Sequence, residues 1–170
     1  MTAPGPTRRR APIAASVATT ALAMLALGVL GAAPTGAAAP STPAKCALTP
    51  SDAGDPAYRP NAPVRSSVGS GFMLTGIVRC GIDCAPIPRA RVEFWLRGPD
   101  GQYDDAHRGT VIADAGGRYR IQSNFPGGTE FRPHIHLRIE VAGFRPLVTV
   151  CFPQGGSQAG AMDLVLEPEL

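Results

Sequence analysis

The chain has 170 residues, with 16 Lys and Arg, 13 Asp and Glu, and four Cys. Three of the basic residues, Arg8, Arg9 and Arg10, stand together near the N-terminus, so the chain without residues 1–39 carries 13 basic and 13 acidic residues. The isoelectric point near 8.9 therefore comes mostly from the leader. This charge balance argues against a nucleic-acid-binding surface. The remaining ~130 residues are enough for one domain with its own core.

Residues 1–39 have the order of a secretory signal peptide. Three arginines are followed by a run without charged residues, from Ala14 to Leu30, and then by small residues up to Ala39. A positive, an apolar and a small-residue region in that order predict export, with cleavage near Ala38. The apolar run is Ala-rich and short for a membrane span, so we expect a secreted protein without a membrane anchor after cleavage. A retained anchor is the alternative, and the arginines leave the Sec and twin-arginine routes open.

Two regions are expected after the leader. Residues 40–68 are rich in Pro, Ala, Ser and Asp and show no periodicity, which predicts an irregular arm. Residues 69–170 alternate short apolar runs with turn clusters, which predicts an all-β domain, a single β-sandwich of about seven strands. The expected strands are 72–78, 91–95, 110–113, 118–122, 134–141, 146–152 and 162–166.

All four cysteines lie after the leader, at positions 46, 80, 84 and 151. An even number of cysteines in an exported chain predicts two disulfides. Cys80 and Cys84 are close enough in sequence to be joined across a turn, so we predict the pairs Cys80–Cys84 and Cys46–Cys151. A zinc site is the alternative, although an oxidising compartment and the lack of a second C-x-x-C pair disfavour it.

The expected strand 134–141 carries two histidines on one face. Side chains alternate along a strand, so its apolar residues face the core and its polar residues face away: His134, His136, Arg138 and Glu140. Two imidazoles at i and i+2 are roughly 6–7 Å apart at the backbone, close enough to bind one metal ion. Histidine suits iron, copper and zinc alike. The alternative interpretation is a polar outer face with two exposed histidines.

Several motifs, in one order along residues 48–153, resemble the intradiol ring-cleavage dioxygenases that act on catechol or protocatechuate. The motifs are Leu48-Thr49-Pro50, Ala85-Pro86-Ile87-Pro88-Arg89-Ala90, Val92-Glu93-Phe94-Trp95, Asp100-Gly101-Gln102-Tyr103, Arg108-Gly109-Thr110, Asp114-Ala115-Gly116-Gly117-Arg118-Tyr119, Phe125-Pro126-Gly127-Gly128 and Arg132-Pro133-His134-Ile135-His136. The resemblance implies a β-sandwich that holds a non-haem Fe(III) through two tyrosinates and two histidines. It also implies oxidative cleavage of a catechol by O₂, between the two hydroxyls, to a muconate-type diacid.

The resemblance also assigns individual residues. Tyr103 matches the first tyrosine ligand, and His134 and His136 match the two histidine ligands. Arg132 matches an arginine beside the site that offsets charge on the substrate. The partners implied are a small aromatic, catechol-type substrate and O₂, with a homo-oligomer as a further expectation. Without the resemblance, Tyr103 would be interpreted as a turn residue and Arg132 as a solvated loop residue.

The chain departs from the family pattern at the second tyrosine ligand. Thr129 stands where that tyrosine is expected, and Val150 stands where some members have glutamine. Glu130 is a possible substitute ligand, and Tyr58 from the arm is another, whereas Tyr119 lies in an expected strand and should pack. Losing one phenolate weakens the preference of a site for ferric iron. We therefore hypothesise that the site binds a metal but turns over catechols slowly or not at all.

Three functional hypotheses follow. The first is an exported, Fe(III)-dependent intradiol-type dioxygenase. The second is a pseudoenzyme of the same fold that binds a metal or an aromatic ligand without ring cleavage. The third is a secreted β-sandwich interaction module. Metal content separates the third hypothesis from the first two, and oxygen uptake separates the first from the second.

Overall fold

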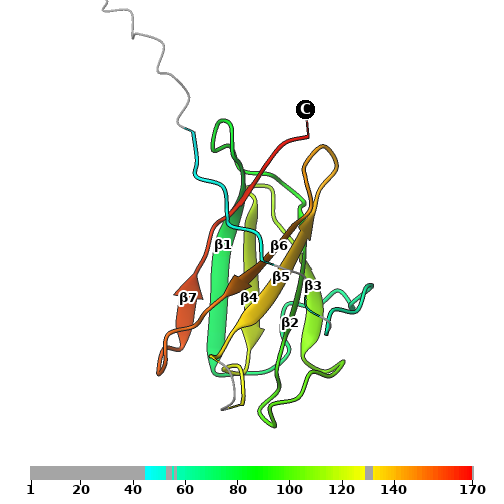
Figure 1. The fold of residues 1–170 in the computed structure, drawn as a ribbon, viewed down its shortest axis with the longest axis vertical. Coiled ribbons are helices and arrows are strands. Elements are labelled where there is room, and N and C mark those ends of the chain that lie inside the picture. Colours follow the sequence, from blue (N-terminus) through cyan, green and yellow to red (C-terminus); the bar gives the residue numbers. More distant parts are fainter. Residues whose placement is uncertain (1–44, 53–54, 56, 129–131, 170) are drawn as a thin grey trace, which may run out of the picture. The chain divides into compact units, whose positions relative to one another are not determined.

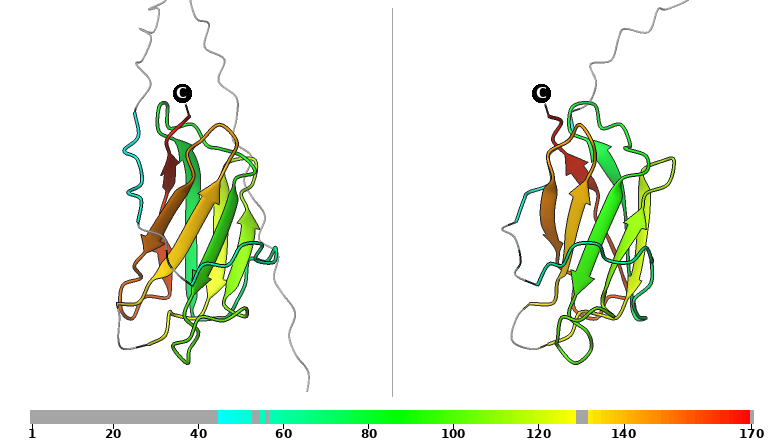
Figure 2. Two further views of the ribbon diagram at one scale, coloured as in Figure 1. Left: turned by 45° about the vertical axis from the view of Figure 1, so that its right-hand side comes forward. Right: turned by 90° about the vertical axis from the view of Figure 1, so that its right-hand side faces the viewer.

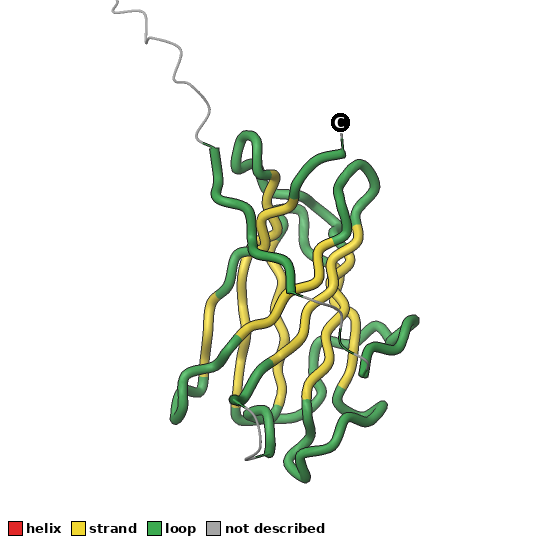
Figure 3. Tube along the Cα trace, in the orientation of Figure 1, coloured by secondary structure: helices red, strands yellow, loops and turns green. Residues whose placement is uncertain are grey.

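The computed structural model describes residues 45–52, 55, 57–128 and 132–169. The expected signal peptide and positions 129 and 130 lie outside these residues, so the predictions made for them stay predictions. The described part of the chain is all-β (Figure 3). It contains no helix with the length and apolar character needed to cross a membrane.

Among the described residues, eight strands form two four-stranded sheets, whose arrangement can be followed in Figure 1. The first sheet has the order β4 (Arg118–Ser123), β1 (Phe72–Cys80) and β7 (Ala159–Ala161), and β8 (Leu164–Leu166) also pairs with β1. The second sheet has the order β3 (Arg108–Ile112), β2 (Arg91–Leu96), β5 (Ile135–Glu140) and β6 (Leu147–Cys151). The sheets face each other in both views of Figure 2, and buried residues of both form one core. The predicted β-sandwich is confirmed.

The predicted last strand, 162–166, is only partly correct. The structure has two short strands here, and both run parallel to β1: β7 pairs with its start and β8 with its end. Between them the chain passes so close to Gly76 that a Cβ there would lie 1.8 Å from the carbonyl oxygen of Met162. The Ile77 N–H donates to the Asp163 side chain at 2.9 Å, in place of a backbone partner. This close passage interrupts the strand at Met162 and Asp163.

The predicted alternation of β5 is confirmed. Ile135, Leu137 and Ile139 are fully buried in the core between the sheets. In the antiparallel register of the second sheet, Leu137 pairs with Phe94 of β2, which is also fully buried. The intervening residues of β2 and β5 therefore lie on the outer face of the sheet, and they include His136.

The outer face of the second sheet is covered by the arm, of which the structure describes residues 45–52, 55 and 57–68. The arm crosses β2 in the right-hand view of Figure 2. The Thr149 hydroxyl donates to the carbonyl of Pro50 at 2.9 Å, and the Thr110 hydroxyl donates to the carbonyl of Ala62 at 2.8 Å. The described residues of the arm form no regular strand and make isolated bridges such as Val64 to Thr110. Its cover gives the outer face a second buried layer made of polar and aromatic side chains.

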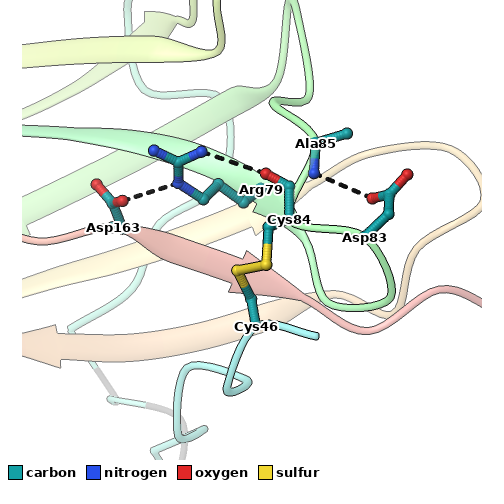
Figure 4. Close-up of a disulfide and its surroundings, with 6 residues drawn as sticks. All are labelled: Cys46, Arg79, Asp83, Cys84, Ala85 and Asp163. Atoms are coloured by element: carbon teal, nitrogen blue, oxygen red, sulfur yellow. Dashed lines mark hydrogen bonds and ion pairs between the residues drawn. A yellow bond between two sulfur atoms is a disulfide. The ribbon is translucent and has the colours of Figure 1, made fainter. Parts of the chain in front are cut away.

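The disulfide pairing differs from the prediction. Cys46 of the arm is bonded to Cys84, with their Cα atoms 5.3 Å apart (Figure 4). Cys80 and Cys151 are free thiols. The predicted pairs Cys80–Cys84 and Cys46–Cys151 are both wrong. The turn after β1 is closed by its backbone, because the Cys84 N–H donates to the Cys80 carbonyl at 3.0 Å and the Cys80 N–H to the Ala85 carbonyl at 2.9 Å. Cys84, at a left-handed φ of 61°, is bonded to the arm rather than to Cys80.

Candidate metal centre

Three of the predicted site residues come together at one point. The Tyr103 hydroxyl lies 2.9 Å from Nε2 of His134 and 3.1 Å from Nε2 of His136. The histidines stand at the start of β5, and Tyr103 belongs to the loop that follows β2. Because Trp95, near the end of β2, pairs with His136, this loop begins beside the histidines. One oxygen and two nitrogens thus converge from segments about thirty positions apart.

His134 is oriented by the backbone just before it. Its Nδ1 lies 2.7 Å from the carbonyl oxygen of Arg132, which can only accept a hydrogen bond. Nδ1 therefore carries the proton, and Nε2 presents a lone pair toward Tyr103. Metal-binding histidines are usually fixed in this way, by an N–H bond from the nitrogen that does not face the ion.

His136 is buried, with 8% of its surface exposed. The Trp95 ring stacks on its imidazole at a centroid distance of 5.0 Å and an interplanar angle of 5°. Burial lowers the pKa of His136, and the charge of Asp55 opposes this shift only in part. The neutral imidazole that a metal requires is therefore the favoured form.

Asp55 of the arm is a member of this cluster that sequence reasoning missed. Its Oδ2 lies 2.7 Å from Nε2 of His136 and accepts the Trp95 indole N–H at 3.0 Å, while Oδ1 accepts the Ala57 N–H at 2.8 Å. Burial alone would raise the pKa of Asp55, but these hydrogen bonds and the two imidazoles lower it. Asp55 is thus a carboxylate in the site, and no periodicity in the arm marks it.

The other groups divide into neighbours of the cluster and residues outside it. The Arg97 guanidinium lies 5.3 Å from the centroid of the Tyr103 ring. Burial and the Asp55 charge raise the pKa of Tyr103, and Arg97 opposes this shift. Arg132 is exposed, with its guanidinium 4.5 Å from the Phe152 ring, and that ring lies 6.1 Å from the His134 ring. Arg132 and Phe152 therefore form one edge of the site.

Two tyrosines considered as ligands lie elsewhere. The Tyr58 hydroxyl donates to Glu93 at 2.7 Å, so Tyr58 does not occupy the place of the second tyrosine ligand. Tyr119 is buried and donates to the Met162 carbonyl at 2.6 Å, which agrees with the predicted packing role. The proposed substitute Glu130 lies outside the described residues.

The donor atoms present fit a metal ion. Nitrogen and oxygen ligands at about 2.0–2.2 Å from one ion are about 3 Å apart when they subtend a right angle. The distances of 2.9 and 3.1 Å from the Tyr103 oxygen agree with this spacing. Within the described ranges, His, Cys, Asp and Glu alone form no group of three suited to a metal, so the candidate site depends on Tyr103. Two imidazoles and a phenolate suit iron.

Comparisons with known sequences find relatives of one kind, although no family model matches. The chain is 31% identical over 112 residues to a chlorocatechol 1,2-dioxygenase of Pseudomonas sp. strain P51, which covers 50% of this chain and 44% of the relative. It is 33% identical over 106 residues to a hydroxyquinol 1,2-dioxygenase of Rhodococcus opacus, covering 47% of this chain and 35% of the relative. The matched region thus spans less than half the length of either relative.

Solved structures share the fold. The dioxygenase domain of a dioxygenase–carbohydrate-binding protein fusion from Streptomyces sp. SirexAA-E superposes with a TM-score of 0.64 at 23% identity, over 72% of this chain and 100% of that domain. An intradiol ring-cleavage dioxygenase from Tetranychus urticae superposes with a TM-score of 0.63 at 18% identity, over 72% and 96% of the two chains. The chain is thus similar in sequence to chlorocatechol and hydroxyquinol 1,2-dioxygenases, and it shares its fold with intradiol ring-cleavage dioxygenases.

Proposed function

We propose that the protein is an exported intradiol-type dioxygenase that uses non-haem Fe(III) to cleave a catechol-type ring. The observation that carries this proposal is the convergence of Tyr103, His134 and His136 within 2.9–3.1 Å. In the reaction, the bond between the two hydroxyl-bearing carbons breaks and each carbon receives one oxygen atom of O₂. Catechol and O₂ thus become a muconate-type diacid, with all atoms retained. The leader and the Cys46–Cys84 disulfide support export.

The residues of this chain would hold the ion and one edge of the substrate. His134 offers the lone pair of its Nε2, whereas Nε2 of His136 and the hydroxyl of Tyr103 become ligands once binding of the ion displaces their protons. When bound, the ferric ion supplies Lewis-acid activation and a template for the substrate. Arg132 and Phe152, which pack together at 4.5 Å, offer a positive charge and an aromatic ring beside the histidines. This pair suits a planar aromatic substrate that carries negative charge.

A second candidate function is metal or aromatic binding without ring cleavage. The observation that favours it is Thr129, which stands where the family has its second tyrosine ligand. A site with one phenolate instead of two donates less negative charge to the ion, so its preference for the ferric state is weaker unless another anion replaces the phenolate. The two candidates predict the same metal content and differ in turnover.

The test uses mature protein recovered after export. Iron content, a visible phenolate-to-iron band and oxygen uptake with catechol should all be positive, and the N-terminal sequence should begin near residue 39. The variants His134→Ala and His136→Ala should lose the metal. His107→Ala is the matched control, because Nδ1 of His107 lies 2.7 Å from Oδ1 of Asp104 and the residue is not part of the cluster of Tyr103, His134 and His136. Iron binding without oxygen uptake would favour the second candidate. Protein that takes up no iron after loading would contradict both candidate functions. The secreted β-sandwich interaction module would then be the remaining hypothesis.

A further inference from the structure

We propose that Asp55 supplies an anionic oxygen ligand to the metal, in place of the second phenolate that the sequence lacks. This inference rests on the proposed function, because it concerns the same ion. The observation behind it is the side of His136 on which the carboxylate lies. Oδ2 of Asp55 is 2.7 Å from Nε2, and Nε2 is also the nitrogen that lies 3.1 Å from the Tyr103 hydroxyl.

The position of Asp55 distinguishes a carboxylate that binds the metal from one that only supports a metal-binding histidine. A carboxylate that only orients a metal-binding histidine contacts the ring nitrogen that faces away from the ion. In His136 that nitrogen is Nδ1, which is buried and has no hydrogen-bond partner among the described residues. Asp55 therefore lies on the ion-facing side of the ring. A nitrogen that binds a metal carries no proton to donate, so the ion takes the place of the proton between Nε2 and Oδ2.

The carboxylate is held by groups that leave it able to bind an ion. The Trp95 indole N–H donates to Oδ2 at 3.0 Å, and the Ala57 N–H donates to Oδ1 at 2.8 Å. A carboxylate offers about four lone-pair positions, so each oxygen keeps accepting capacity. Trp95 also stacks on His136 at 5.0 Å, so one side chain fixes both the carboxylate and the imidazole. Trp95 is thereby a positioning residue for the site.

The charge of the resulting set matches what ferric iron requires. Two neutral imidazoles, the Tyr103 phenolate and the Asp55 carboxylate together carry two negative charges, as two imidazoles and two phenolates would. A carboxylate is a hard oxygen donor, so it favours the ferric over the ferrous ion. Asp55 and Tyr103 reach the histidines from different segments, the arm and the loop after β2. The set depends on Tyr103, because Asp55 and the histidines alone form no group of three suited to a metal among the described residues.

The experiment compares Asp55→Asn with wild type in the full mature protein. Affinities for Fe(III) and Fe(II) are measured separately by competition with chelators, together with the visible phenolate band. Asp55→Asn should weaken Fe(III) binding by at least ~10-fold. Fe(II) binding should weaken less, because a lost negative charge matters most for the more highly charged ion. Asp55→Glu should recover part of the ferric affinity. Asp114→Asn is the matched control, since it removes one negative charge in the turn before β4.

The outcomes keep the two proposals apart. Equal ferric and ferrous losses in Asp55→Asn would indicate a merely structural role and overturn the inference. The inference would also be overturned if Asp55→Asn left the Fe(III) affinity unchanged and Glu130→Gln lowered it instead. That result would leave the proposed function intact. Wild-type protein that binds no iron would refute the proposed function itself. Circular dichroism of each variant confirms that the sandwich is folded.

Discussion

The two faces of the sheet β3-β2-β5-β6 are both buried, but by different interactions. On the inner face, side chains such as Phe94 and Leu137 belong to one cluster of buried apolar residues from both sheets. On the outer face, Glu93 and Trp95 are only 4% and 3% exposed, yet each is hydrogen-bonded to the arm. The stability of the inner face depends on the apolar surface area that is buried and on how well the side chains fill the volume. The stability of the outer face depends on whether each buried polar group finds its hydrogen-bond donor or acceptor. The same strands therefore combine a tolerant core with a site that depends on individual atoms.

The largest expected effect is the loss of apolar packing on the inner face. Phe94→Ala removes a fully buried ring and should lower the free energy of unfolding by ~3–5 kcal/mol. Urea denaturation of metal-free protein measures the change, so that bound ion does not contribute. Ile112→Ala is the control, because Ile112 is 46% exposed and its loss should cost less than ~0.5 kcal/mol. Equal losses in the two variants would contradict the assignment of the core.

The second effect releases the arm from the sandwich. The double variant Cys46→Ser, Cys84→Ser removes a link across a sequence separation of 38 residues, which should cost ~2–4 kcal/mol. Denaturation without reductant measures the loss. Alkylation of the unreduced, denatured wild type should label Cys80 and Cys151 only. Labelling of Cys46 or Cys84 instead would show that the pairing described here is wrong.

A third effect tests the charged part of the outer face. Glu93 is bonded by Arg91 at 2.8 Å and by Tyr58 at 2.7 Å. Burial alone would raise the pKa of Glu93, but these bonds and the charges of Arg91 and Arg138 lower it below the ordinary 4.5. Glu93→Gln should cost ~1–3 kcal/mol at pH 7.

The pH dependence of this variant follows from the lowered pKa. Because the folded state binds the Glu93 proton less tightly than the unfolded state, the stabilisation is complete above pH 4.5. It is lost as the pH falls through the lower folded pKa. The difference in unfolding free energy between wild type and Glu93→Gln should therefore shrink below pH 4.5. A difference that is constant from pH 7 to the acid limb would show that the charge of Glu93 is not the cause.

The smallest effect removes one hydroxyl from the arm. Tyr58→Phe keeps the ring, which lies 5.1 Å from the Trp95 ring, but loses the bond to Glu93. We expect a loss of ~1 kcal/mol, measured by thermal and urea unfolding. The same substitution at Tyr119 removes a hydroxyl that donates to the Met162 carbonyl, between β7 and β8. Only Tyr58→Phe should raise the pKa of Glu93, since Tyr58 is among the groups that lower it.

The sequence was most informative where a pattern repeats. Alternation along β5 predicted which residues face the core, and the ordered motifs predicted that Tyr103 would meet His134 and His136. The division of the last strand was not predicted, because it depends on the close passage of Met162 over Gly76.

The arm shows why the rest of the site could not be predicted. Its place is set by single hydrogen bonds, such as Trp95 to Asp55 across forty positions of sequence, and no local pattern encodes such a pair. The disulfide was mispredicted for the same reason, since closeness in sequence suggested Cys80 as the partner of Cys84 whereas the path of the arm brings Cys46 there. Contacts between aperiodic segments are properties of the whole fold.

The Cys46–Cys84 bond has a topological consequence for Asp55. The bond closes a covalent ring of chain that runs from Cys46 through the arm and β1 back to Cys84, and Asp55 lies within that ring. If the hydrogen bonds of the arm break by thermal motion, the carboxylate stays tethered at both ends. Its return to His136 is then an intramolecular encounter at high effective concentration. The arm is thus a closed loop that is covalently attached to the sandwich. Solvent can reach Tyr103, His134 and His136 transiently, while Asp55 stays close enough to rebind.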